Sequence, residues 1–119
     1  MKYEEAIKIV EKEFETRYVD TDCRAIRINM TYDGVNGLHA VICAKGDESL
    51  ITDEGITKDI FYKSYDEAQW RAMCEENGFS LNGYGHIERP FGSITDIHDF
   101  IDFLLLISDK FNPLPNAPL

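Results

Sequence analysis

The chain has 119 residues, of which 22 are acidic and 12 are basic, so its formal net charge is −10. An apolar fraction of 44% and a charged fraction of 29% are typical of one globular domain and exclude a collagen-like or disordered chain. Because nonspecific nucleic-acid binding requires clustered Lys and Arg, we expect no direct binding to DNA or RNA.

The first half of the chain predicts one helix followed by three strands. Apolar residues recur at helical spacing from Tyr3 to Phe14, which indicates an amphipathic helix of about four turns. Alternation over Arg24–Thr31, and apolar residues over Leu38–Ala44 and Ser49–Thr52, are typical of strands. The connections between these strands are too short for crossovers, so we expect an antiparallel meander.

A short helical turn, Thr57–Tyr62, and a longer helix follow the meander. Ser64 and Glu67 have the spacing of a capping box, in which each side chain binds the other residue's backbone N–H. The helix that they open is predicted to continue to Glu76 and to end at Asn77–Gly78, because glycine tolerates the left-handed conformation found after helix ends.

The last part of the chain predicts a hairpin and a final helix. Phe79–Leu81 and His86–Arg89 flank a glycine-rich turn, which is typical of a β-hairpin. Ser93 is predicted to cap a strongly apolar helix, Ile94–Phe111.

Together these elements predict an α+β fold. We expect a single domain over residues 1–112, with an antiparallel sheet of about five strands (the meander plus the hairpin) packed against the N-terminal, middle and C-terminal helices. Residues 113–119 contain three prolines and are predicted to form a tail. The predicted core consists of Phe14, Ile26, Ile28, Val41, Trp70, Met73, Ile97, Ile101 and Leu104.

Membrane and secretory segments are not predicted. The longest purely apolar run, Phe103–Ile107, is far shorter than the roughly 18 residues of a membrane span. The N-terminal residues contain early acids and no apolar stretch, so no secretory signal is expected. The three cysteines are odd in number and widely spaced, which is typical of a reducing, intracellular compartment.

The sequence contains no familiar catalytic or metal-binding motif. It has no glycine-rich phosphate loop, no serine nucleophile elbow and no paired Cys/His spacing. Asp53 follows a strand, as the nucleophile of some phosphatases does, but Gly55 stands where those enzymes need a general acid. We therefore predict no enzymatic activity, no cofactor and no metal, although a small site assembled from loops stays an alternative.

The segment Ile51–Ile60 begins with Ile-Thr-Asp-x-Gly-x-Thr and resembles a small family carried by phages, prophages and other mobile elements. A helix ending in Asn77-Gly-Phe79, a hairpin and an apolar last helix add to the likeness, which covers residues 20–111. The resemblance implies a fold and a mobile-element context, hence the cytoplasm of a bacterial host, but no activity. As turn formers, Asp53, Gly55 and Thr57 are also explained by structure alone.

The acidic residues are concentrated in the second half, since residues 47–109 contain 14 acids and 4 bases. A solvated surface explains such charge, and so does a face that attracts a basic partner. On the last helix three acids recur every third residue, about 4.5 Å apart along the axis, and an apolar side chain follows them. The predicted partner-binding residues are Asp53, Glu54, Asp59, Asp66, Glu67, Glu75, Glu76, Asp96, Asp99, Asp102 and Leu106.

These observations predict a small acidic interaction protein that covers the basic surface of a nucleic-acid-binding effector complex. A phage inhibitor of a bacterial defence system, such as an anti-CRISPR protein, is the concrete form of this hypothesis. Two alternatives stay open. One is an enzyme or ligand-binding domain with an unrecognised site, and the other is a structural or assembly protein that acts as a homodimer or larger homo-oligomer.

Overall fold

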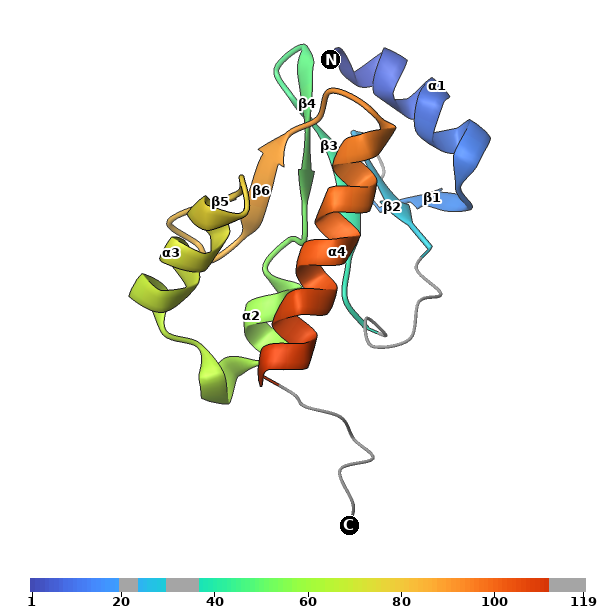
Figure 1. Cartoon of the computed structure of the whole chain (residues 1–119). Coiled ribbons are helices and arrows are strands. Elements are labelled where there is room, and N and C mark those ends of the chain that lie inside the picture. The colour runs from blue at the N-terminus through green and yellow to red at the C-terminus, as the bar shows by residue number, and fades with distance from the viewer. Residues whose placement is uncertain (20–23, 30–36, 112–119) are drawn as a thin grey trace.

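The computed structural model describes residues 1–19, 24–29 and 37–111, and within them the helices and strands follow the order shown in Figure 1. The predicted tail, residues 113–119, lies outside the described residues, as does Cys23. The helices are α1 (Tyr3–Glu13), α2 (Ile56–Ile60), the 3-10 helix η1 (Tyr62–Ser64), α3 (Glu67–Glu76) and α4 (Ile94–Phe111). The strands are β1 (Thr16–Tyr18), β2 (Ala25–Ile28), β3 (Ala40–Lys45), β4 (Glu48–Thr52), β5 (Ser80–Leu81) and β6 (Ile87–Pro90).

The strands form one antiparallel sheet in the order β1-β2-β3-β4-β6-β5. This confirms the α+β class, with its meander of β2, β3 and β4 and its hairpin of β5 and β6. The hairpin extends the meander because β6 pairs with β4. The described residues contain six strands instead of about five. The additional strand, β1, has only three residues, too few to show a two-residue period.

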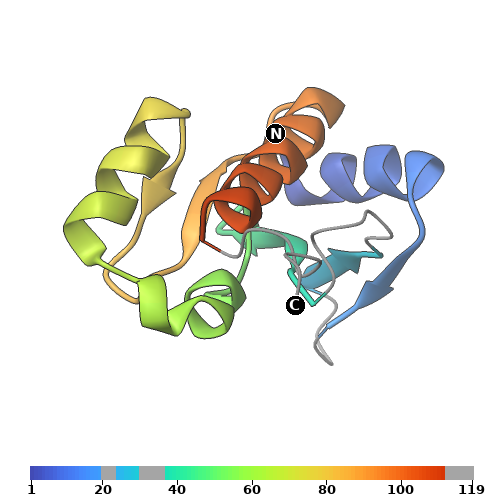
Figure 2. The ribbon, with the colours of Figure 1, turned by 60° about the horizontal axis from the view of Figure 1, so that its bottom comes forward.

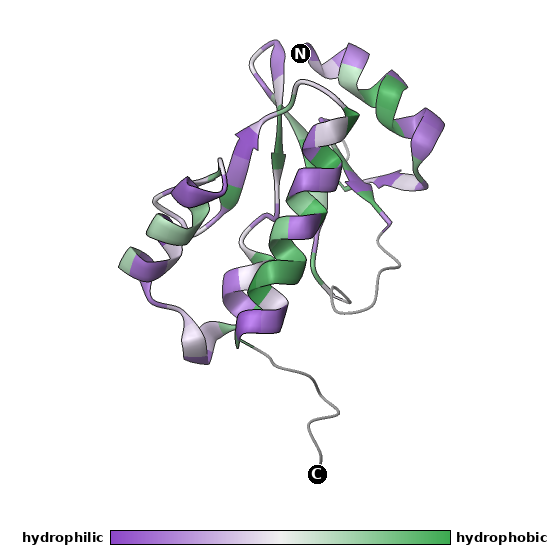
Figure 3. Ribbon diagram, viewed as in Figure 1, coloured by the Kyte–Doolittle hydropathy of each residue, from purple (hydrophilic) through white to green (hydrophobic). Residues whose placement is uncertain are grey.

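The helices α1, α3 and α4 lie on the same side of the sheet, as Figure 2 shows. The register explains this placement, because Ile26, Ile42 and Ile51 are directly opposite one another on β2, β3 and β4 and are all buried. Figure 3 shows the matching pattern on α4, whose apolar turns alternate with polar ones along the visible side. The core therefore lies between the sheet and this layer of helices.

Eight of the nine predicted core residues are buried. The exception is Phe14, which is half-buried at the end of α1 and lies with its ring 6.1 Å from that of His98. Val41 is buried too, but it lies opposite Arg27 and Thr52 in the register and outside the main apolar cluster. A strand pattern predicts burial but does not say which face of the sheet provides it.

The predicted C-terminal end of α3 is correct, but its predicted N-cap is wrong. Its N-cap is Asp66, whose side chain accepts a hydrogen bond from the Gln69 backbone N–H, so the predicted capping box at Ser64 is wrong by two residues. Its C-terminus confirms the prediction: Gly78 has a φ of +82°, and Gly78 and Phe79 donate to the carbonyls of Glu75 and Cys74.

Candidate functional site

The acidic stripe on α4 is the part of the predicted site that the structure defines best. The helix buries Phe100, Phe103 and Leu104, whereas Asp99 and Asp102 lie on its exposed face. Asp96 is the first acid of the stripe and lies one turn before Asp99. The three carboxylates have different surroundings and therefore different roles.

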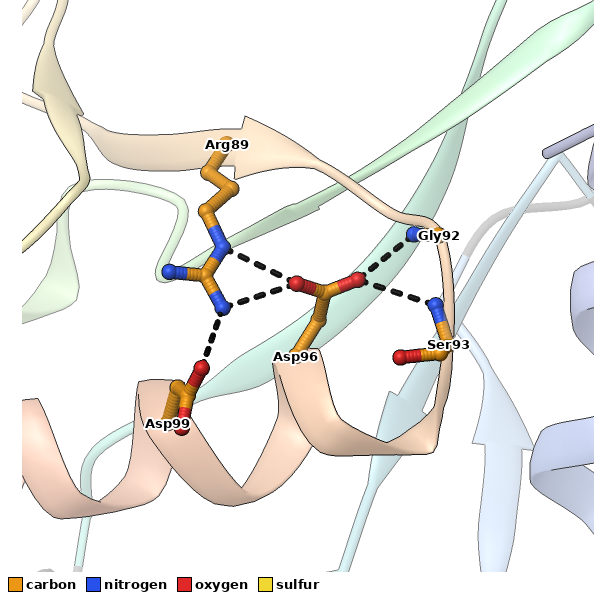
Figure 4. Close-up of polar contacts among 5 residues, drawn as sticks. All are labelled: Arg89, Gly92, Ser93, Asp96 and Asp99. Carbon is orange, nitrogen blue, oxygen red and sulfur yellow. Dashed lines mark hydrogen bonds and ion pairs between the residues drawn. The ribbon is translucent and has the colours of Figure 1, made fainter.

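The carboxylate of Asp96 binds within the molecule, as Figure 4 shows. One oxygen accepts hydrogen bonds from Nε and Nη2 of Arg89 at 3.0 and 2.7 Å, and the other accepts from the backbone N–H groups of Gly92 and Ser93 at 2.6 and 2.9 Å. Asp96 thus ties β6 to the start of α4. Its side chain is only 18% exposed, so its prediction as a partner-binding residue is corrected.

Asp99 also binds Arg89, but its side chain is partly exposed to solvent. Nη2 of Arg89 donates to Asp99 at 2.8 Å, while half of the Asp99 side chain is exposed. The guanidinium also lies 4.4 Å from the centroid of the Phe79 ring. Burial lowers the pKa of Arg89, but hydrogen bonds to Asp99 and Asp96 outweigh it and raise that pKa above its ordinary value. Arg89 is therefore permanently charged.

A groove of about 400 Å³ lies beside this arginine, between the end of α3 and the middle of α4. We call it the α3–α4 groove. Phe79 and Phe103 are buried residues of its lining, and their rings stack with centroids 4.9 Å apart. Leu106 is 46% exposed, so the predicted apolar anchor is accessible. The groove is lined by Asn77, Phe79, Asp99, Asp102, Phe103 and Leu106.

Two further predicted acids directly precede Asn77, one of the residues that line the groove. Glu75 and Glu76 are exposed residues of the last turn of α3. The C-terminal end of a helix carries partial negative charge, which adds to that of the two carboxylates. Asp102 forms no ion pair with a described residue. The groove therefore combines apolar surface with an excess of negative charge.

Asp53 is not part of any surface. It is fully buried, and its carboxylate accepts hydrogen bonds from the backbone N–H groups of Gly55, Thr57 and Ile87 at 2.9, 3.2 and 2.9 Å. These bonds join the end of β4, the start of α2 and the start of β6. The prediction that Asp53 contacts a partner is therefore corrected, and its interpretation as a turn-forming residue is the one that fits.

The remaining predicted acids are dispersed. Asp66 caps α3, and Glu67 accepts a hydrogen bond from Arg71 at 3.0 Å within the same helix. Both lie at the opposite end of α3 from the groove, about 15 Å along the helix axis. Asp59 is exposed on α2 and does not line the groove. These three residues therefore belong to the general acidic surface.

Glu54 belongs to a polar cluster that the sequence did not predict. Its carboxylate lies 3.6 Å from Nδ1 of His39, while Nη1 of Arg27 lies 3.1 Å from Nε2 of the same ring. Glu54 also has a left-handed backbone, with φ of +57°. Because a guanidinium can only donate, Arg27 occupies the lone pair that a general base would need. The pairing of β2 with β3 brings Arg27 to the start of β3, next to His39, and this pairing is the feature from which the cluster could have been predicted.

The described residues hold no group of three His, Cys, Asp or Glu side chains arranged to bind a metal ion. Among the helices of those same residues, none is long and apolar enough to cross a membrane. Comparisons of the chain with models of protein families, with curated proteins and with solved structures find no match. The function is therefore inferred from the geometry of the site itself.

Proposed function

We propose that this chain is a small acidic interaction protein whose α3–α4 groove receives a basic, arginine-containing segment of a nucleic-acid-binding protein. The observation that carries this proposal is the position of Arg89. Its guanidinium lies over an aromatic ring and bonds to two carboxylates at one end of the groove. The chain thus contains an example of the contacts that an arginine of a partner would make.

The groove presents another carboxylate beside apolar surface one turn further along α4. Asp102 lies three residues beyond Asp99, about 4.5 Å along the helix axis. Leu106, which is 46% exposed, provides accessible apolar surface next to it. A planar guanidinium binds a carboxylate with two donors and is more weakly hydrated than an ammonium group, so a second arginine suits the position beside Asp102 and Leu106 better than lysine does.

The distribution of charge supports a basic partner. Clefts lined by charge of one sign raise the local concentration of oppositely charged ligands and accelerate their association. Proteins that bind nucleic acid carry clustered Lys and Arg for contacts to phosphates. An acidic protein that occupies such a cluster displaces the nucleic acid, and this is the activity that we propose.

The resemblance of Ile51–Ile60 to a family of mobile elements supports a more specific form of the proposal. In that form the chain is encoded by a phage or prophage, acts in the cytoplasm of a bacterial host, and inhibits a defence complex as anti-CRISPR proteins do. The protein is then not an enzyme, and its activity lies in the stability of the complex that it forms.

Displacement of labelled DNA tests this function. Purified nucleic-acid-binding effector complexes of bacterial defence systems are titrated with the protein at two salt concentrations. We expect DNA to be released with an apparent affinity that falls steeply as salt rises, because exposed charges form much of the contact. If no effector releases DNA at low salt, or if release is independent of salt, the proposal is wrong.

A further inference from the structure

The strand β1 is one edge of the sheet, and its outward-facing backbone groups form no hydrogen bond with another described residue. Val19 donates to the carbonyl of Ala25, and Asn29 donates to that of Glu15. Because hydrogen-bonded pairs alternate in an antiparallel ladder, Glu15, Arg17 and Val19 direct their backbone groups to β2. The N–H and C=O groups of Thr16 and Tyr18 consequently point outward.

This edge is accessible and lies beside the helix layer, not beneath it. Figure 2 shows β1 at the margin of the sheet, with α1 above the sheet on the helix side. Glu15 and Arg17 are exposed, and 47% of Tyr18 is accessible. Neither Glu15 nor Arg17 forms an ion pair with a described residue.

The side chains of the edge are complementary to themselves. Residues of two antiparallel strands face each other in pairs whose numbers have a constant sum. When Thr16 of one copy lies opposite Thr16 of a second copy, Glu15 of each lies opposite Arg17 of the other, and the cross-strand charges attract. Shifting the two strands to the next register in one direction places Arg17 opposite Arg17, and shifting them in the other direction places Glu15 opposite Glu15. Both shifts bring like charges together and are therefore less favourable.

We propose that two copies of this chain associate through their β1 strands in this register and form a continuous twelve-stranded sheet. The interface is two-fold symmetric and self-complementary, as homodimer interfaces are. Thr16 of each copy exchanges two backbone hydrogen bonds with its counterpart, and the Tyr18 N–H of each donates to the carbonyl of Phe14 of the other. The two-fold pair of contacts between Glu15 and Arg17 selects this register.

Such a contact buries little surface, so the dimer is weak. An interface of three or four residues on each side lies below the size of stable complexes, and we expect a dissociation constant of roughly 10–100 µM. The net charge of −10 on each copy opposes association over long distances, and salt screens that repulsion. The dimer is therefore expected to form at physiological salt and to persist when salt is raised moderately.

Sedimentation equilibrium of the full chain and of charge variants tests the dimer. The wild type is expected to change from the 13.7 kDa monomer to a species of twice that mass as its concentration rises. Arg17→Glu places Glu opposite Glu, and Glu15→Arg places Arg opposite Arg, so each variant alone is expected to dimerise at least about tenfold more weakly. An equimolar mixture of the two restores opposite charges and is expected to form the heterodimer.

Thr16→Pro provides a test that does not involve charge. It removes an N–H that points outward and leaves the hydrogen bonds between β1 and β2 in place. We expect a folded monomer, checked by circular dichroism. A wild type that stays monomeric to about 500 µM overturns the proposal. A dimer that Arg17→Glu and Thr16→Pro leave unchanged also overturns it, because another surface then forms the contact. Neither result bears on the α3–α4 groove.

Discussion

The carboxylate of Asp53 accepts hydrogen bonds from three backbone N–H groups that belong to different segments of the chain. Removing it leaves three buried donors without partners. Asp53→Ala is therefore expected to lower the free energy of unfolding by about 3–5 kcal/mol, measured by urea denaturation. Asp59→Ala removes an exposed acid from α2 and is the matched control, with an expected change within about 0.5 kcal/mol. Equal effects would contradict a structural role for Asp53.

Gly55 is required for two independent reasons. Its φ of +81° is unfavourable for residues with a side chain, and a Cβ atom there would lie 2.7 Å from Cδ2 of His86. We expect Gly55→Ala to lower the free energy of unfolding by about 2–4 kcal/mol. Gly46 also has a positive φ, of +63°, but open space around it, so Gly46→Ala measures the backbone cost alone, about 1 kcal/mol. If both variants lose the same stability, the contact with His86 has no consequence.

Burial raises the pKa of the Cys74 thiol to about 12, and the nearby charge of Asp53 adds to the shift. The neutral thiol is thus favoured in the folded state, and the unfolded chain releases this proton at lower pH. Stability is expected to fall as the pH rises from about 9 towards about 12, by up to about 1.4 kcal/mol per pH unit from this group. Unfolding of the parent and of Cys74→Ala at several pH values measures the difference in slope. Parallel pH profiles would show that Cys74 titrates normally.

At the scale of elements, the sequence predicted most helices and strands because their residues repeat with a clear period. The apolar stripe of α4 and the alternation in β2 and β3 are examples. Features without a period were missed. The strand β1 is three residues long, and the N-cap of α3 is Asp66, which bonds the Gln69 N–H, instead of Ser64, which was predicted to bond the Glu67 N–H. Ser64 is instead the last residue of η1.

The carboxylate of Asp96 stabilises the connection between β6 and α4 more than the carboxylate of Asp99 does. Asp96 makes four hydrogen bonds, whereas Asp99 makes one and is half exposed. We expect Asp96→Ala to cost about 2–4 kcal/mol of unfolding free energy and Asp99→Ala less than about 1 kcal/mol. Thermal or urea unfolding of the two variants gives the comparison. A larger loss for Asp99→Ala would mean that the pairing of Arg89 is assigned to the wrong acid.

At the scale of the whole molecule, the candidate site could be predicted only in part. The spacing of Asp99, Asp102 and Leu106 on one helix was enough to place them together, and all three line the same groove. Their neighbours Asn77 and Phe79 come from another element, so no local pattern links them to α4. Sequence also could not show that Asp53 is buried or that Asp96 is saturated, because both facts depend on backbone N–H groups brought together by folding.

We propose that the α3–α4 groove, and not the acidity of the whole molecule, binds the basic partner. Two double variants change the net charge equally: Asp99→Lys with Asp102→Lys in the lining of the groove, and Glu4→Lys with Glu11→Lys on exposed positions of α1. Fluorescence anisotropy with a labelled peptide of alternating Arg and Leu measures binding at low and moderate salt. We expect the groove variant to bind at least about tenfold more weakly with a flatter salt dependence, and the α1 variant to bind within about threefold of the parent. Equal losses in the two variants would contradict the proposal, because the binding would then follow net charge alone.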